Sequence, residues 1–390
     1  MFFCGIDVAK RKHVALFLHD TGTIAQRAFE ITNTRAGLEE LAQRLKALPE
    51  PVTVGLEATG HYWLALYEFL TQHGYPVVVL NPLQIHAYRR SGVRKCKTDR
   101  TDAFWVADFV RIGNGQATPP TLPVLVQLRE LSRFRFRLTE QVGDCKRKII
   151  AILDRVFPEY ETLFSNVFLV SSRRLLAEAV TAQEFADLDL TELARVLQSA
   201  SRGRFGADKA VAVQTLARQS VGVGFLADAV RVEMRCLLEQ IELVETQRTQ
   251  IDEALEGLMA QVPQFLTTIP GIGLATGAAV LAEIGEIQRF PSAEKLVAYA
   301  GIDATVYQTG EFEADHAHMS KRGSPYLRHA LWQAASMARL HDPELRAYYE
   351  RKRAEGKHHG TAVGAICRKL IARIYIVLKE QRPYEVRSAN

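Results

Sequence analysis

Four acidic residues in the first third of the chain could act together on a phosphate group. Asp7 lies inside the apolar run FCGIDVAKRKHVALFL and Glu57 ends the run VTVGLE, and we expect both runs to be strands. Asp99 and Asp102 lie three residues apart at the expected start of a helix, so their side chains share one face. Carboxylates from two strands and one helix can converge, and oxygen clusters of this kind bind Mg²⁺ or Mn²⁺ for phosphoryl transfer.

Each of these acids also has an ordinary structural explanation. Asp99 follows Thr98 and could cap the helix, while Asp102 could simply complement the helix dipole. Asp7 is harder to explain in this way, because an acid inside an apolar strand is costly unless it is paired or bound to a metal. Basic residues that suit an approaching phosphodiester backbone surround the second pair of acids: Lys95, Lys97 and Arg100.

A possible nucleophile lies in the last quarter of the chain, in the polar segment HMSKRGSPYLRHALWQAA. A serine hydroxyl attacks effectively only beside a base, a metal or cationic groups, and Ser320 is followed directly by Lys321 and Arg322. Ser324 precedes Pro325, the pattern of an N-cap and the first residue of a helix, so its role is expected to be structural. Ser320 is therefore the candidate.

Two other patterns could bind nucleic acid. The segment IPGIGLATGAAVLAEIG is similar to a helix-hairpin-helix element, in which Gly271 and Gly273 would expose backbone N–H groups to a phosphate; turn and packing roles for these glycines stay open. Arg129, Arg133 and Arg137 share one stripe of an expected helix. That stripe could follow a DNA or RNA backbone, or it could be the charged flank of a coiled coil.

The elements that must position these residues form an α/β plus α organisation. Short β-rich runs predict strands at 3–8, 13–19, 52–57 and 76–80, with helices near 35–48 and 62–73, so residues 1–118 should form a mixed-sheet domain. The Gly- and Pro-containing stretch 113–120 marks its end.

The remainder of the chain is expected to be mainly helical. Apolar residues follow heptad seams at 124–156 and 230–262, interrupted by Arg135 and Arg248, so residues 119–264 predict a coiled-coil stalk with an insert at 157–224. The two helices could pair antiparallel within one chain or between chains. Residues 265–390 would form the C-terminal domain that carries Ser320.

Composition excludes several classes of protein and favours a polyanionic partner. With 390 residues, of which 47% are hydrophobic, the chain is neither disordered nor fibrous. The net charge of +5 is unevenly spread, because residues 316–390 hold 15 basic and 6 acidic residues. Five scattered cysteines without a CxxC pair favour a reducing cytoplasm over disulfides or thiolate zinc sites. We expect neither a signal peptide nor a membrane span.

The motifs GIDVAK, GLEATG and KTDRTDA together resemble the DEDD tetrad of the RuvC-like (RNase H-like) domain in Piv/MooV-type transposases, the insertion-sequence one-ten family. The resemblance implies that Asp7, Glu57, Asp99 and Asp102 hold Mg²⁺ or Mn²⁺. It also implies that the segment SKRG-x-x-x-LR supplies a serine that attacks DNA, a pattern that matches here at the following positions: Ser320, Lys321, Arg322, Gly323 and Arg328.

The same resemblance implies partners as well as chemistry. Enzymes of this family use a noncoding bridge RNA that pairs with donor and target DNA, and one subunit's acids meet another subunit's serine in a homo-oligomer, a dimer or tetramer. The expected function is thus that of a bacterial transposase acting on element ends and target DNA at the nucleoid. The sequence leaves two alternatives open: a metal-dependent nuclease or Holliday-junction resolvase that uses water, and a non-enzymatic nucleic-acid scaffold.

Overall fold

The computed structural model describes residues 1–58, 60–91, 98–114, 122–303, 308–309, 312–313 and 319–386. The chain divides into two compact units, Met1–Pro120 and Thr121–Asn390. No helix in these described ranges has both the length and the apolar character that a membrane crossing requires.

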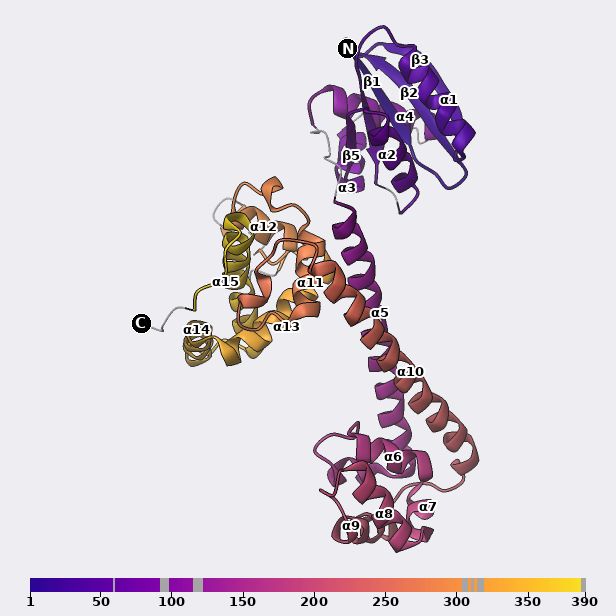
Figure 1. Cartoon of the computed structure of the whole chain (residues 1–390), viewed down its shortest axis with the longest axis vertical. Helices are drawn as coiled ribbons and strands as arrows, with labels where there is room; N and C mark the ends of the chain where they lie inside the picture. The colour runs from indigo at the N-terminus through magenta and orange to yellow at the C-terminus, as the bar shows by residue number, and fades with distance from the viewer. Residues whose placement is uncertain are drawn as a thin grey trace. The chain divides into compact units, whose positions relative to one another are not determined.

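A five-stranded mixed sheet forms the centre of the first unit (Figure 1). In space the order is β3-β2-β1-β4-β5; β1, β2 and β3 are antiparallel neighbours, whereas β4 runs parallel to both β1 and β5. The strands are β1 Phe2–Asp7, β2 Lys12–His19, β3 Ile24–Thr32, β4 Val52–Glu57 and β5 Val77–Leu80. The predicted mixed α/β architecture is therefore confirmed. Strand β3 was not predicted, because it is an edge strand whose polar residues obscure the alternation.

Helices cover both faces of this sheet. Alternation along the strands sends Phe2, Cys4 and Ile6 into one core, where they pack against α1 and α2. The opposite face packs against α4, through residues such as Ala103 and Ala107. The helices of this unit are α1 Arg35–Lys46, α2 Trp63–Gln72, α3 Pro82–Ser91 and α4 Asp99–Arg111.

Two long helices, α5 (Pro123–Val156) and α10 (Ala227–Met259), pack along each other in the second unit (Figure 1). Their contacts run in opposite order along the chain: Arg135 pairs with Asp252, whereas Arg155 pairs with Glu233. The pair is thus antiparallel and lies within one chain, the first of the two arrangements that the heptads allowed. Arg135, one of the charged interruptions of the seam, is accommodated by its ion pair with α10.

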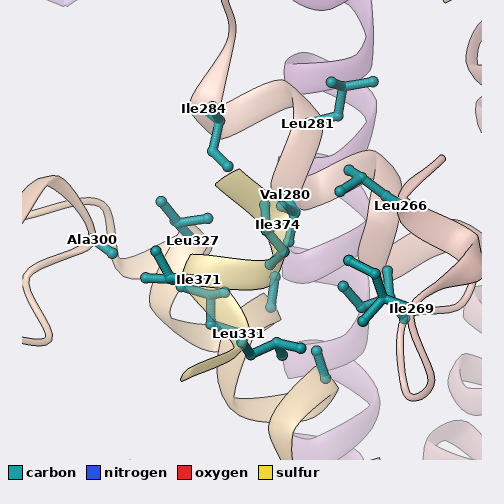
Figure 2. Close-up of a cluster of buried hydrophobic side chains, with 14 of the residues drawn as sticks. Leu266, Ile269, Val280, Leu281, Ile284, Ala300, Leu327, Leu331, Ile371 and Ile374 are labelled. Atoms are coloured by element: carbon teal, nitrogen blue, oxygen red, sulfur yellow. The ribbon is translucent and has the colours of Figure 1, made fainter. Parts of the chain in front are cut away.

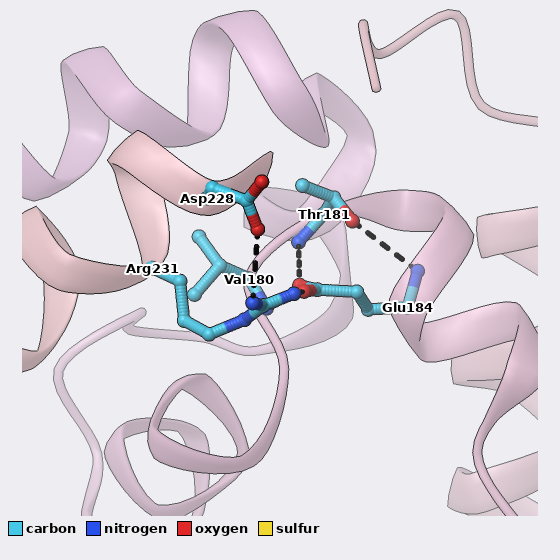
Figure 3. Close-up of polar contacts among 5 residues, drawn as sticks. All are labelled: Val180, Thr181, Glu184, Asp228 and Arg231. Atoms are coloured by element: carbon cyan, nitrogen blue, oxygen red, sulfur yellow. Dashed lines mark hydrogen bonds and ion pairs between the residues drawn. The ribbon is translucent and has the colours of Figure 1, made fainter. Parts of the chain in front are cut away.

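Between α5 and α10 the chain builds a small helical cluster with its own core. Buried apolar residues of α10, such as Met234 and Leu237, belong to this core, and a polar contact adds to it. Glu184 accepts hydrogen bonds from the backbone N–H groups of Val180 and Thr181 at 2.9 Å each, and its carboxylate also binds Arg231 of α10 (Figure 3). This cluster fills the expected insert. Its helices are η1 Pro158–Leu163, α6 Val170–Glu178, α7 Ala182–Asp187, α8 Leu190–Ala200 and α9 Ala207–Arg218.

The last part of the chain packs its helices around the largest apolar core. Side chains from α11, α13 and α15, among them Val280, Leu331 and Ile374, are almost completely buried and meet in its centre (Figure 2). The elements here are η2 Leu266–Thr268, α11 Leu274–Ile284, η3 Ile287–Arg289, α12 Ala293–Ala300, β6 Gln308–Thr309, β7 Phe312–Glu313, α13 Pro325–His341, α14 Pro343–Ala354 and α15 His359–Glu380.

Candidate active site

Two of the four acids end adjacent parallel strands. The register pairs Ile6 of β1 with Leu56 of β4, so Asp7 and Glu57 terminate their strands side by side. Because side chains alternate between faces, both acids point away from the α1 and α2 core and toward the face that α4 covers. The strands thereby bring two carboxylates to one edge of the sheet.

Two glycines let α4 approach the sheet closely. A β-carbon at Gly5 would lie 2.1 Å from the carbonyl oxygen of Ala103, and one at Gly55 would lie 2.8 Å from the side chain of Val110. Neither position could carry a side chain without moving the helix. The missing side chains therefore place the first turn of α4, with its two acids, over the ends of β1 and β4.

The N-terminus of α4 is capped by Thr98, whose side chain accepts a hydrogen bond from the backbone N–H of Thr101 in a capping box. The suggestion that Asp99 caps this helix is therefore wrong: Asp99 is the first residue inside the helix, and its side chain is exposed. Asp102, by contrast, is 7% exposed. A buried carboxylate needs a partner.

That partner is Arg89 of α3. Its guanidinium bridges two acids of the tetrad, with Nη2 2.7 Å from Glu57 Oε2 and Nη1 3.3 Å from Asp102 Oδ2. All three side chains are largely withdrawn from water, since at most 19% of each is exposed. Arg89 acts as an internal counter-ion that neutralises part of the negative charge gathered here.

The electrostatics of Asp7 show that the acids share one site. The pKa of Asp7 is raised to about 6, first by burial and then by the negative charges of Asp102, Asp99 and Glu57, while Arg89 acts in the opposite direction. The part of this shift that comes from like charges requires the other three acids to lie near Asp7. The other three acids that the sequence suggested therefore lie near enough to Asp7 to act on its charge, and a shared metal site stays a prediction.

The donor set fits a divalent cation in chemical type. All four side chains are carboxylates, the hard oxygen ligands that Mg²⁺ and Mn²⁺ prefer, and their mutual repulsion would be relieved by a cation. In the part of the chain that the structure describes, however, no three His, Cys, Asp or Glu side chains are grouped closely enough to hold one ion. Arg89 supplies the positive charge in this arrangement.

The predicted nucleophile lies in the second unit, on a constrained loop. The backbone N–H of Ser320 donates to the Asp303 carbonyl oxygen at 3.0 Å, and Ser320 Oγ donates to the Asp303 carboxylate oxygen Oδ1. Lys321, the next residue, has φ of 51°, a left-handed conformation that costs energy for a residue with a side chain. Strain beside the candidate hydroxyl indicates that the loop is held rather than free.

The same loop is held at its next glycine. A β-carbon on Gly323 would lie 1.8 Å from the carbonyl oxygen of Tyr299, so the chain crosses the end of α12 where only glycine fits. Arg328 of α13 fastens the crossing, because its Nη1 donates to the carbonyl oxygens of Gly323 at 2.6 Å and Ala300 at 3.3 Å. Arg328 therefore fixes the loop that carries Ser320.

A buried carboxylate anchors this loop to α5. Glu283, at the end of α11, is 3% exposed and receives two bonds from Arg133, at 2.7 and 3.1 Å. Ser324 donates its hydroxyl to Glu283 at 2.7 Å and accepts the N–H of Leu327 as the N-cap of α13. The structural role predicted for Ser324 is thus confirmed, and the carboxylate adds a second bond to it.

The residues proposed for nucleic-acid binding have varied surroundings. Lys95 and Lys97 lie outside the described residues, and Arg100 is exposed beside the acids. On the α5 stripe Arg133 is committed to Glu283, and Arg129 donates to the Ala282 carbonyl oxygen at 3.0 Å. Because these two side chains bond within the protein, the stripe does not present a continuous row of free cations to a DNA or RNA backbone. The exposed residues of the set stay candidates for phosphate contacts: Arg100, Arg137, Lys321 and Arg322.

The two glycines of the hairpin-like segment also differ. Gly271 lies against the backbone of α13, where a β-carbon would be 2.4 Å from the Ala338 nitrogen, so it serves helix packing. Gly273 precedes α11 as its N-cap, without a close neighbour on its α-carbon. Phosphate binding at this turn stays a prediction.

Sequence reasoning missed three residues that shape the site. Arg89 was not singled out in the sequence, although the four acids already called for a counter-charge. Glu283 stands in the apolar run ATGAAVLAEIG, the same signal that singled out Asp7, and it could have been found in that way. Asp303 carries no distinguishing local pattern, because its contact with Ser320 arises only from the folded loop.

Comparison with known proteins assigns the chain to a family. Residues 4–158 match the family described as transposase, of the DEDD and IS110 type, and residues 263–350 match the transposase family IS116/IS110/IS902. The chain belongs to the IS110 family of transposases. The first match contains the four acids of the tetrad, and the second contains Ser320.

Full-length relatives agree with the IS110 assignment. The chain is 26% identical over 408 residues to a Streptomyces coelicolor protein assigned as the mini-circle transposase for IS117, covering 99% of this chain and 96% of that protein. It is 25% identical over 396 residues to the pilin gene-inverting protein of Moraxella bovis, covering 99% and 98%. These relatives are named for DNA recombination, and the family membership makes the present chain a transposase, an enzyme of that class.

Proposed function

We propose that this IS110 transposase cuts and rejoins element ends and target DNA through a covalent bond between Ser320 and a DNA phosphate, assisted by divalent metal at the tetrad. The observation that carries the proposal is that Asp7 and Glu57 end adjacent parallel strands, while Arg89 joins Glu57 to Asp102 of α4. Such a site attracts cations, and the phosphate groups of DNA bring metal ions with them.

The chain's own residues would divide the work. Asp7, Glu57, Asp99 and Asp102 would hold Mg²⁺ or Mn²⁺, which when bound stabilises negative charge on the reacting phosphate. Ser320 would attack the phosphorus, and the phosphoserine bond would conserve the energy needed for rejoining. Exposed cations beside each centre, Arg100 near the acids and Lys321 beside the serine, would grip the DNA backbone.

Two partners complete the proposal, and both rest on the family resemblance. A noncoding bridge RNA would pair with donor and target DNA. The protein itself would then contact the sugar-phosphate backbones and recognise the shape of the nucleic acids more than their bases. A homo-oligomer, a dimer or tetramer, would bring the acids of one subunit to Ser320 of another, with further coiled-coil packing of α5 and α10 as one means of assembly. The enzyme would act at the bacterial nucleoid.

The test is a covalent-trap assay. Purified full-length protein is mixed with Mg²⁺, labelled DNA that carries element ends and target, and RNA transcribed from the element's flank, and the mixture is then denatured. We expect a protein–DNA band that disappears in Ser320→Ala and in Asp7→Asn, but persists in Ser324→Ala, the matched serine control. Omitting the RNA should reduce the band if guidance is required.

A hydrolytic nuclease or junction resolvase remains the second candidate. One observation favours it: all four acids belong to the unit Met1–Pro120, whereas Ser320 belongs to the other unit. A water nucleophile would need the first unit alone. Cleaved DNA without a protein adduct, undiminished in Ser320→Ala, would select this second candidate and overturn the phosphoserine mechanism.

A further inference from the structure

Ser320 has a carboxylate acceptor of its own, separate from the acids of the tetrad. Its hydroxyl donates to Asp303 Oδ1, while its backbone N–H donates to the Asp303 carbonyl oxygen at 3.0 Å. The two residues are thus joined twice, once through backbone and once through side chains. The backbone bond already fixes the loop, so the side-chain bond has a separate effect: it directs the hydroxyl proton toward a carboxylate.

Among the described residues of this loop and its anchor, the carboxylate of Asp303 is the group placed to accept the proton of Ser320. Lys321 and Arg322 are exposed cations and cannot take a proton from a serine. Glu283, the other carboxylate of the loop's anchor, is committed to Arg133 and to Ser324. Asp303 is only partly buried, and its acceptor oxygen is the one in contact with Ser320.

From this geometry we infer that Asp303 is the general base for Ser320, an inference that rests on the proposed phosphoserine mechanism. Ser320 Oγ forms a bond to the phosphorus of a DNA phosphodiester, and its proton passes to Asp303. The bond from phosphorus to one sugar oxygen breaks, and that oxygen leaves with the electron pair and takes a proton from solvent. In the rejoining step the sugar hydroxyl attacks the phosphorus and gives its proton to solvent, the bond from phosphorus to Ser320 Oγ breaks, and protonated Asp303 returns its proton to the leaving Oγ.

Aspartate is a weak base in water, yet this role is chemically sound. Protein kinases use an aspartate to accept the proton of a substrate hydroxyl as it attacks phosphorus, because the proton becomes acidic as the new bond forms. General bases of this kind contribute about 10² to 10⁴ in rate. The fixed contact in this loop supplies the short donor–acceptor approach that such a transfer needs.

The decisive variant is Asp303→Asn, which still accepts the Ser320 hydrogen bond but cannot take up a proton. The full-length protein is used with Mg²⁺, element DNA and flanking RNA, and the rate of adduct formation is measured in a single turnover. We expect Asp303→Asn to slow adduct formation by about 100-fold or more, and Asp303→Glu to recover part of the rate. Glu294→Gln, an exposed carboxylate change on α12, is the matched control and should match the wild type.

The outcomes separate this inference from the proposed function. A wild-type adduct that requires Ser320 but forms within about threefold of the normal rate in Asp303→Asn would overturn the role of Asp303 and leave the phosphoserine mechanism standing. Absence of any Ser320-dependent adduct in the wild type, with DNA still cleaved, would overturn both. Melting temperature and DNA affinity are measured for each variant, and a loss in Asp303→Asn that merely follows a loss of folding or binding would also refute the base.

Discussion

Replacing Arg89 with methionine removes the cation that bridges Glu57 and Asp102 while keeping a long unbranched side chain. The guanidinium lies 2.7 Å from one carboxylate and 3.3 Å from the other, and all three groups are mostly buried. Removing one partner of a buried pair costs about 3 to 5 kcal/mol, because the remaining charge is left in a poorly solvated place. The melting temperature of the first unit should therefore fall by roughly 12 to 20 °C when EDTA is present.

The same variant should respond more strongly to a divalent ion than the wild type does. In the wild type an incoming ion competes with Arg89 for two carboxylates, whereas in Arg89→Met it meets no such competitor. We expect calorimetric titration with Mn²⁺ to give tighter binding to Arg89→Met, together with a larger thermal stabilisation. A ligand at 100 times its Kd adds about 2.7 kcal/mol of stability, enough to recover most of the loss.

The control for this experiment is Arg90→Met, which removes an exposed arginine from the next position of α3. It should change stability by less than about 0.5 kcal/mol and leave metal affinity unaltered. If Arg89→Met were as stable as Arg90→Met in EDTA and bound Mn²⁺ no better, Arg89 would not be the counter-ion of the tetrad, and the electrostatic account of the site would be refuted.

Three further predictions follow from the same contacts. Asp7→Asn should stabilise the metal-free protein by about 1 to 2 kcal/mol at pH 7.5, a figure reduced for solvent screening. Burial and the neighbouring acids raise the pKa of Asp7 from 3.8 to about 6, so the wild type regains this stability as the pH falls from 6 toward 4. Urea titrations in EDTA at both ends of that range should show that the gain from Asp7→Asn disappears at the lower pH. Gly5→Ala should cost roughly 3 kcal/mol, since the new methyl group would overlap the backbone of α4. The control is Gly143→Ala, which changes a helical glycine of α5. If the two variants had equal urea midpoints, the close packing of α4 on the sheet would be disproved. Arg133→Ala should destabilise the second unit by about 3 to 5 kcal/mol, because Glu283 is left buried without its cation. Arg133→Lys should recover only part of this stability, because lysine cannot form both bonds. Full recovery of stability in Arg133→Lys, measured by chemical denaturation, would contradict the two-bond geometry.

The sheet and its acids could be predicted from sequence because both depend on local pattern. Alternation of apolar residues predicted four strands. An acid within such a run, Asp7, indicated a site where a buried carboxylate has a partner. The helix start at Asp99 was predicted, although its cap is Thr98. Strand β3 was missed because it lies at the sheet edge and Ile31 is its one fully buried residue, so its sequence lacks a run of apolar core positions.

The remaining parts of the site depend on contacts between distant segments. Arg89 meets Glu57 across 32 positions, and Arg133 meets Glu283 across 150. Nothing in the flanking residues of either arginine distinguishes a buried counter-ion from a solvated surface charge. The stripe containing Arg133 has the spacing of a phosphate rail, yet the fold uses its charge to neutralise Glu283.

The pairing of α5 with two different neighbours limits how the length of this helix can vary. Arg133 forms an ion pair with Glu283 of α11, and Arg155, 22 positions later in α5, forms an ion pair with α10. Each residue inserted between these anchors would rotate one relative to the other by about 100° and lengthen the helix by about 1.5 Å. Single insertions would turn Arg133 away from Glu283 and loosen the serine loop, whereas whole heptads would restore the angular phase. Length variation among related transposases should therefore concentrate in the segment 157–224 and spare the helix itself.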